Sequence, residues 1–125
     1  MNAEGTSYRL AEIERKVSRL CRLGTVTEVD HAAARLRVRI GDLITYPLPW
    51  LTPRAGHDRA WWAPEVGEQV LVFAPSGALA QAVVLPGIFQ TAHPAPEASA
   101  DVAAMHFGDG AVIRYDRAAH HLEAT

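Results

Sequence analysis

Two adjacent histidines near the end of the sequence carry the side chains best suited to bind a metal. His120 and His121 both offer an imidazole, a ligand that suits zinc, nickel and iron. Neighbouring side chains on a strand point to opposite faces, so each chain can direct only one of the two imidazoles toward a shared axis. One alternative is a ring of three inward imidazoles from three chains. The others are a histidine pair on a half-exposed strand, or a metal-binding tip that lies beyond Thr125 in a longer protein. We predict no resident metal or other cofactor. If a metal is bound, His120 and His121 are its candidate ligands.

The acidic, serine and cysteine side chains do not form a catalytic pattern. Asp109 lies between two glycines, which is typical of a hairpin turn. His57 and Asp58 are adjacent in a loop, but Ser76 belongs to a different turn, and no strand–serine–helix elbow is present. The single cysteine, Cys21, excludes an internal disulfide and falls in a predicted helix, where it is expected to be a small packed residue. We therefore predict no catalytic residues and no enzymatic activity.

Alternating arginines and three tryptophans are the residue types that bind a single-stranded nucleic acid. The arginines are Arg35, Arg37 and Arg39, and the tryptophans are Trp50, Trp61 and Trp62. Arginine at alternate positions is equally typical of a solvent-facing strand. The formal net charge of −2, from 12 basic and 14 acidic residues, lacks the basic excess of a dedicated nucleic-acid binder. A nucleic-acid-binding module is therefore the alternative function, and no nucleic-acid partner is expected.

Trp61 and Trp62 are adjacent in a loop rich in proline, glycine and charge. At least one of the two rings must point away from the core, because neighbouring side chains diverge. Exposed tryptophans on a loop are typical of interface anchors. We predict that Trp61 and Trp62 contact another chain, whereas Trp50, between Pro49 and Leu51, is expected to be packed.

An amphipathic helix is predicted from Tyr8 to Leu23. Its apolar residues recur at the spacings of a coiled-coil or bundle seam. They are Leu10, Ile13, Val17 and Leu20. Gly24 is expected to end the helix as the residue after its C-terminus. A helix this short is marginal alone, so its stripe packs either on its own domain or on copies of itself.

Short strands follow, because the apolar period changes to two from Thr25 onward. The predicted strands are residues 25–29, 34–40, 43–51, 66–73 and 80–85. In the second of these, Leu36, Val38 and Ile40 face a core. Pro47 and Pro49 restrict the third to an edge strand or an extended loop. Five strands without intervening helices predict a small antiparallel barrel or sandwich, and a five-stranded Greek-key barrel fits best.

A proline-containing linker and three further β segments complete the chain. The segments, residues 105–107, 111–115 and 120–124, form a meander too small to have its own core. They either dock on the barrel or wrap with identical copies around a common axis. Val112, Ile113 and Tyr115 are the predicted interface residues of this meander. The last strand runs directly into Thr125, as though a longer meander continued beyond it.

Several segments resemble, in the same order, the phage baseplate assembly protein V family of central tail spikes. These segments are residues 22–26, 48–56 with Trp61 and Trp62, 64–70, 84–87 and 107–116. The resemblance extends over nearly the whole chain from Tyr8. It implies a mainly β protein with an N-terminal helix at 1–23 and a five-stranded OB-fold barrel at 24–90. A linker at 91–101 would follow, and the short strands at 102–125 would begin an intertwined trimeric β-prism.

The resemblance also implies a structural function in a contractile tail, an R-type bacteriocin or a related type VI secretion spike. A homotrimer would seat on the baseplate hub and tail tube and puncture the outer membrane of the target bacterium. Full-length spikes of this family hold iron at a His-x-His tip, and this motif is absent here. The chain begins without the apolar region of a signal peptide. We expect synthesis in the bacterial cytoplasm and a place at the centre of the baseplate of a virion or phage-tail-like particle.

Overall fold

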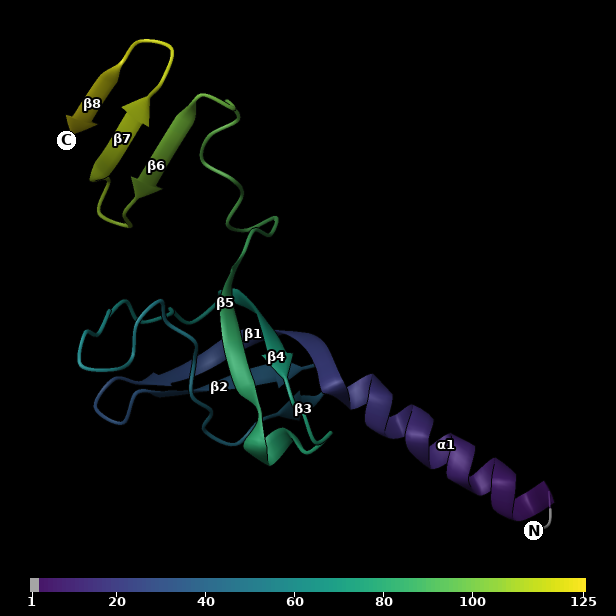
Figure 1. Ribbon diagram of the computed structural model, residues 1–125. Coiled ribbons are helices and arrows are strands. Elements are labelled where there is room, and N and C mark those ends of the chain that lie inside the picture. Colours follow the sequence, from purple (N-terminus) through teal and green to yellow (C-terminus); the bar gives the residue numbers. More distant parts are fainter. Residues whose placement is uncertain (1–2) are drawn as a thin grey trace. The chain divides into compact units, whose positions relative to one another are not determined.

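The computed structural model describes residues 3–125, which form two compact units (Figure 1). The first unit extends to Ile88 and the second comprises Phe89–Thr125. The elements of the first unit are α1 (Ala3–Leu20), β1 (Cys21–Asp30), β2 (Arg35–Ile40), β3 (Leu43–Ile44), β4 (Gln69–Phe73), the short 3-10 helix η1 (Leu79–Gln81) and β5 (Val83–Ile88). The elements of the second are β6 (Val102–His106), β7 (Val112–Asp116) and β8 (His121–Ala124).

The helix begins at Ala3, earlier than the predicted start at Tyr8, and ends at Leu20, three residues before the predicted end at Leu23. β1 begins directly after Leu20 and pairs with β4, from Cys21 opposite Phe73 to Thr25 opposite Gln69. The amide of Ala74 donates to the carbonyl of Leu20 at 2.8 Å, so the strand pairing reaches back to the last helical residue. The prediction that Cys21 lies in the helix is wrong, because tertiary pairing overrides the weak helical preference of this short segment. Cys21 is an exposed residue of β1.

Gly24 has a role that differs from the predicted one. It lies inside β1, paired with Val70, and does not cap the helix. A Cβ atom at this position would collide with Cγ1 of Val38 and come within 2.8 Å of the carbonyl oxygen of Arg39. Gly24 is therefore required by the close approach of β1 and β2.

The strands of the first unit form a sheet in the order β3-β2-β1-β4-β5, with antiparallel neighbours. The extended segment after β3 closes this sheet, because Trp50 bridges Val84 in parallel. The amide of Leu51 donates to the carbonyl of Val84 at 2.8 Å, and the amide of Val84 donates to the carbonyl of Pro49 at 2.9 Å. Pro49 supplies only an acceptor here, as a residue without an N–H must. The closed sheet is consistent with the predicted OB-fold barrel.

The core of the barrel consists of small and medium apolar side chains. They are Val26, Leu36, Val38, Ile40, Leu48, Val70, Val72, Ala74, Ala82 and Val84. In β2, Leu36, Val38 and Ile40 are buried while the arginines between them are not, which confirms the predicted alternation. Within the described residues, no helix combines the length and hydrophobicity that crossing a membrane requires.

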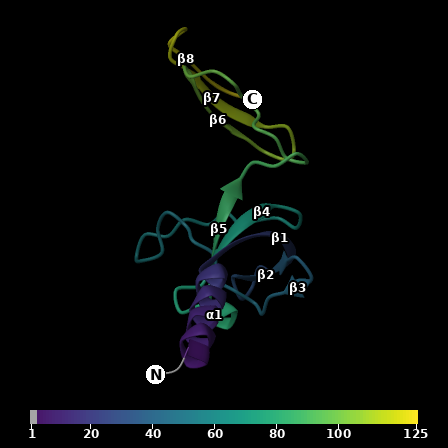
Figure 2. The same cartoon turned by 90° about the vertical axis from the view of Figure 1, so that its right-hand side faces the viewer.

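The second unit is a three-stranded antiparallel meander in the order β6-β7-β8. Its strands lie side by side in Figure 1 and form a single layer that Figure 2 shows nearly edge-on. Two tight turns join them. The carboxylate of Asp109 accepts a hydrogen bond from the amide of Ala111 at 2.9 Å, and that of Asp116 accepts one from the amide of Ala118 at 2.9 Å. Asp109 and Asp116 therefore stabilise turns.

Candidate interaction surfaces

One face of the β6–β8 sheet is apolar over its whole width. The strand register places the apolar residues in two rows, Ala103–Tyr115–Leu122 and Met105–Ile113–Ala124. The four large side chains in these rows remain accessible, from 39% for Tyr115 to 70% for Leu122. A single-layer sheet that leaves such a face open gains little from folding alone. This apolar face is the first candidate interaction surface.

The opposite face of the same sheet carries charges that pair with one another. Nε of Arg114 donates to Oε1 of Glu97 at 2.9 Å, and Nη1 of Arg114 lies 4.0 Å from Asp116. Nε2 of His106 lies 3.4 Å from Oε2 of Glu97. Glu97 comes from the segment before β6, so this segment folds over the charged face. The two faces of the sheet are therefore chemically distinct, and the segment before β6 contributes to the charged one.

The hydrogen bond from Arg114 holds the pKa of Glu97 below its ordinary value. Partial burial opposes this shift, and the charge of Arg114 and the interaction with His106 reinforce it. The same pairing raises the pKa of Arg114. Glu97 and Arg114 therefore form a charge-assisted hydrogen bond that ties the linker to the sheet.

The structure divides the predicted interface residues of the meander between its two faces. Ile113 and Tyr115 lie on the apolar face, whereas Val112 is opposite His106 on the charged face. Met105 and Leu122 complete the apolar face, and sequence reasoning missed both. The signal was present, because alternate residues of each strand share a face.

The structure places the adjacent residues His120 and His121 in different local settings. His120 lies in the turn before β8 with a φ of 51°, and Nε2 of His121 lies 3.4 Å from Oε2 of Glu123. Across residues 3–125, the structure places no three His, Cys, Asp or Glu side chains where they could hold a metal ion together. These residues do not reproduce the donor set of an iron site at a His-x-His tip.

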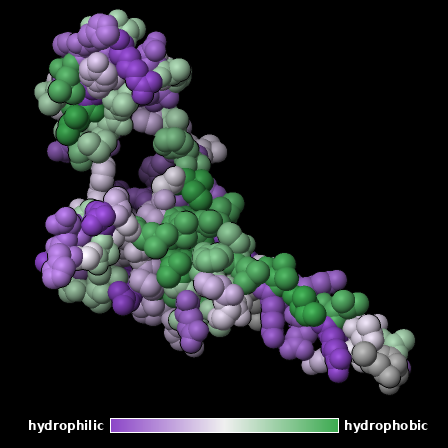
Figure 3. All heavy atoms as spheres, viewed as in Figure 1, coloured by the Kyte–Doolittle hydropathy of each residue, from purple (hydrophilic) through white to green (hydrophobic). Residues whose placement is uncertain are grey.

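The apolar stripe of α1 is the second candidate surface. Leu10, Ile13 and Val17 are each more than half exposed, and Leu20 is partly buried at the junction with β1. Figure 3 shows apolar residues along one side of α1 and hydrophilic residues along the other. Of the two predicted alternatives, packing of the stripe on its own barrel is not what the structure shows.

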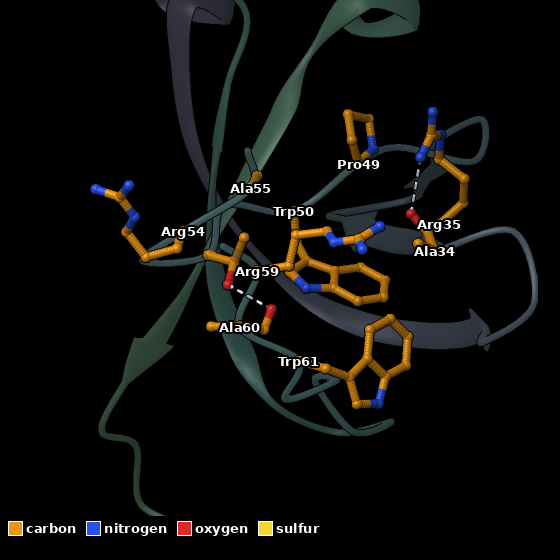
Figure 4. A pocket seen from close by; sticks show the side chains of 10 residues that line it. Ala34, Arg35, Pro49, Trp50, Arg54, Ala55, Arg59, Ala60 and Trp61 are labelled. Carbon is orange, nitrogen blue, oxygen red and sulfur yellow. Dashed lines mark hydrogen bonds between the residues drawn. The ribbon is translucent and has the colours of Figure 1, made fainter. Parts of the chain in front are cut away.

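A cavity of about 500 Å³ beside the barrel is the third candidate surface, called here the tryptophan cavity (Figure 4). It lies between the start of β2, the segment that closes the barrel and the loop that follows. Its lining residues are Ala34, Arg35, Pro49, Trp50, Thr52, Arg54, Ala55, Arg59, Ala60 and Trp61. Sequence reasoning identified the two tryptophans but did not assign Arg54 or Arg59 to a site.

Trp50 and Trp61 form the aromatic part of the tryptophan cavity. Their ring centroids are 5.6 Å apart and their planes meet at 56°, a tilted arrangement typical of attractive aromatic pairs. Trp50 packs against the barrel core, as predicted, whereas Trp61 is 63% exposed. Trp62 is equally exposed, so both rings of the predicted pair are accessible.

The loop that carries Trp61 is held by its own hydrogen bonds. The amide of Ala60 donates to the carbonyl of Arg54 at 2.9 Å, and that of Gly56 donates to the carbonyl of Asp58 at 3.1 Å. The hydroxyl of Thr52 donates to the carbonyl of Ala60 at 3.0 Å. These bonds make a small hairpin that presents its side chains in a defined arrangement.

The predicted row of arginines on β2 is partly engaged with the chain itself. Nη1 of Arg35 donates to the carbonyl of Ala34 at 2.9 Å. Nε of Arg37 donates to the carbonyl of Thr45 at 2.9 Å, and its Nη1 lies 3.8 Å from Glu28. The row is therefore not a continuous track of uncommitted positive charge.

Comparison with known proteins gives two findings. Residues 22–89 match the family described as the type VI secretion system/phage-baseplate injector OB domain. Over 111 residues, the chain is 47% identical to the spike protein of Escherichia phage P2, and this alignment covers 89% of the chain and 53% of that protein. The chain thus spans about half the length of this relative.

Proposed function

The chain belongs to the family of type VI secretion system and phage-baseplate injector OB domains, and on this premise we propose that it is the homotrimeric central spike of a contractile tail or phage-tail-like particle. The helix and barrel seat the trimer on the baseplate hub, and the C-terminal strands begin the needle that punctures the target outer membrane. The role is structural, without catalysis or a cofactor. The family match does not favour the nucleic-acid-binding alternative.

The apolar face of the β6–β8 sheet is the observation that carries this proposal. Fully burying a large apolar side chain contributes roughly 1.5–3 kcal/mol, and this face exposes four of them. Around a threefold axis, three copies of the sheet turn these faces toward one another and exclude water from them. The arrangement also brings the outer edges of β6 and β8 against neighbouring chains, where their unpaired backbone groups find partners.

The distribution of charge supports the same arrangement. The charged residues of the sheet lie on the face where Glu97, Arg114 and His106 interact, so they stay in contact with water when the apolar faces meet. In a needle built this way, strands from different chains share the load of a pushing force.

The test is the oligomeric state of the full chain by sedimentation equilibrium at micromolar concentration. We expect a mass three times that of the chain. Ile113→Glu places a charge on the apolar face and is expected to yield monomers. Val112→Glu is the matched control, because its side chain falls on the charged face beside Arg114, and the trimer should persist.

Tryptophan near-UV circular dichroism of the barrel serves as the folding control for both variants. A wild-type chain that sediments as a monomer contradicts the proposal. So does a trimer that Ile113→Glu leaves unchanged while the barrel stays folded.

A further inference from the structure

We propose that the tryptophan cavity binds an acidic peptide segment with apolar side chains, supplied by a neighbouring protein of the baseplate. This inference rests on the proposed function, because it assigns a surface and a partner chemistry to the barrel of the spike. Three properties of the cavity carry it, namely its aromatic floor, its charge and its preformed loop.

The aromatic surface favours a ligand with apolar side chains. Trp50 is anchored on the barrel core, and Trp61 leans against it with 63% of its surface open to solvent. Large aromatic side chains that are both exposed and held in place are the residues that dominate binding energy in interfaces. An aliphatic or aromatic side chain of a partner would cover the open part of Trp61 and fill the space beside Trp50.

The charge of the cavity favours a ligand with carboxylates. Its lining includes Arg35, Arg54 and Arg59 and contains no Asp or Glu. Among residues 3–125, no carboxylate forms an ion pair with any of these three arginines. Figure 4 shows the side chain of Arg59 extending beside Trp50 and that of Arg54 directed to the other side. Guanidinium groups bind carboxylates through paired, charge-assisted hydrogen bonds, so a partner's Asp or Glu is the complementary group.

The preformed loop favours binding without a large ordering cost. The hydrogen bonds of Ala60, Gly56 and Thr52 join residues of the same chain and hold the hairpin closed. A surface that is already in its binding arrangement loses less conformational entropy when a ligand arrives.

The geometry favours a peptide over a single-stranded nucleic acid. Trp50 and Trp61 are tilted toward each other by 56° and contact one another, so they do not offer two parallel open faces for successive bases. On β2, Nη1 of Arg37 lies 3.8 Å from Glu28, which partly offsets the charge of Arg37 and interrupts the track of charge that a phosphate backbone follows.

The test selects ligands for the full chain from a randomised dodecapeptide display library, with counter-selection on the Trp61→Ala variant. We expect enriched peptides with Asp or Glu close to an aliphatic or aromatic residue.

Fluorescence polarisation of a labelled consensus peptide then measures affinity. Arg59→Gln and Trp61→Ala are each expected to weaken binding roughly tenfold, the effect of losing one charge-assisted contact or one anchor. Rising salt is expected to weaken it as well.

Arg39→Gln is the matched control, because Arg39 is an exposed arginine of β2 that does not line the cavity. Affinity should be unchanged in this variant. Enrichment of peptides without acidic residues overturns the inference, as does equal binding by the wild type and Arg59→Gln. Tighter binding of oligothymidylate than of the peptide also overturns it.

Sedimentation of the same preparations separates this inference from the proposed function. A trimer that binds no library peptide contradicts the inference alone. A monomer that binds an acidic peptide through Arg59 contradicts the trimeric spike alone. If Trp61→Ala converts the trimer into monomers, the cavity belongs to a contact between copies of the chain, and the inference of a different protein partner is wrong.

Discussion

Glu97 joins the linker to the charged face of the C-terminal sheet, and its ionisation makes this contact depend on pH. The pKa of its carboxyl group is lowered from 4.5 by the hydrogen bond from Arg114. A carboxyl group with a lowered pKa in the folded state contributes stability that is complete above its unfolded pKa. That contribution is lost as the pH falls through the pKa that the group has in the folded state.

We therefore predict that Glu97→Gln lowers the stability of the folded chain near neutral pH and has a smaller effect at acidic pH, below the lowered pKa. The measurement is the difference in unfolding midpoint between wild type and variant at a series of pH values from neutral downward. This difference reports the effect of the substitution on stability at each pH. Glu14→Gln, an exposed residue of α1 outside the network, is the control and should show no such trend. A constant difference at all pH values would contradict the assigned role of the carboxylate.

At the scale of elements, the junction between α1 and β1 shows how strand pairing determines where a helix ends. The apolar repeat of the helix continues to Leu20, and the next residues could extend the helical pattern to Leu23. The backbone groups of residues 21–25 instead pair with β4, and Gly24 allows β2 to approach from the other side. Pairing of residues 21–25 with β4 therefore decides the boundary.

Gly24→Ala is expected to destabilise the barrel by about 1–3 kcal/mol, the usual cost of inserting a methyl group into a tightly packed site. The added Cβ would press on Val38 and on the carbonyl of Arg39. Chemical denaturation followed by tryptophan fluorescence measures the change. Gly56→Ala is the matched control, because nothing lies within 4 Å of a Cβ at that position. Equal stabilities of the two variants would refute the close-approach explanation.

At the scale of the whole molecule, the two units differ in what stabilises them. The barrel buries a continuous core of ten apolar residues, whereas the C-terminal sheet exposes its apolar face. The stability of a unit that depends on association rises with protein concentration, and the stability of a self-contained unit does not.

Calorimetry of the full chain is therefore expected to show a transition of the C-terminal sheet that moves to higher temperature when the protein concentration is raised tenfold. The barrel transition should stay in place. In the Ile113→Glu variant, the concentration dependence should disappear. A C-terminal transition that is independent of concentration in the wild type would show that the sheet needs no partner copy.

Local patterns in the sequence determined much of the architecture. The alternation of Leu36, Val38 and Ile40 with arginines predicted which face of β2 is buried, because side chains on a strand alternate strictly. Pro47 and Pro49 predicted an extended segment with few ladder bonds, since proline lacks the donor. The spacing of Leu10, Ile13 and Val17 predicted the apolar stripe of α1.

The tertiary structure alone decided the features that depend on residues far apart in the chain. The end of α1 follows from pairing with β4, whose residues come about fifty positions later. The tryptophan cavity exists because closure of the barrel brings the start of β2 beside the loop that carries Arg59 and Trp61. The two complete faces of the C-terminal sheet depend on the register between three strands. Contacts of this kind are set by packing and pairing, so no local spacing in the sequence specifies them.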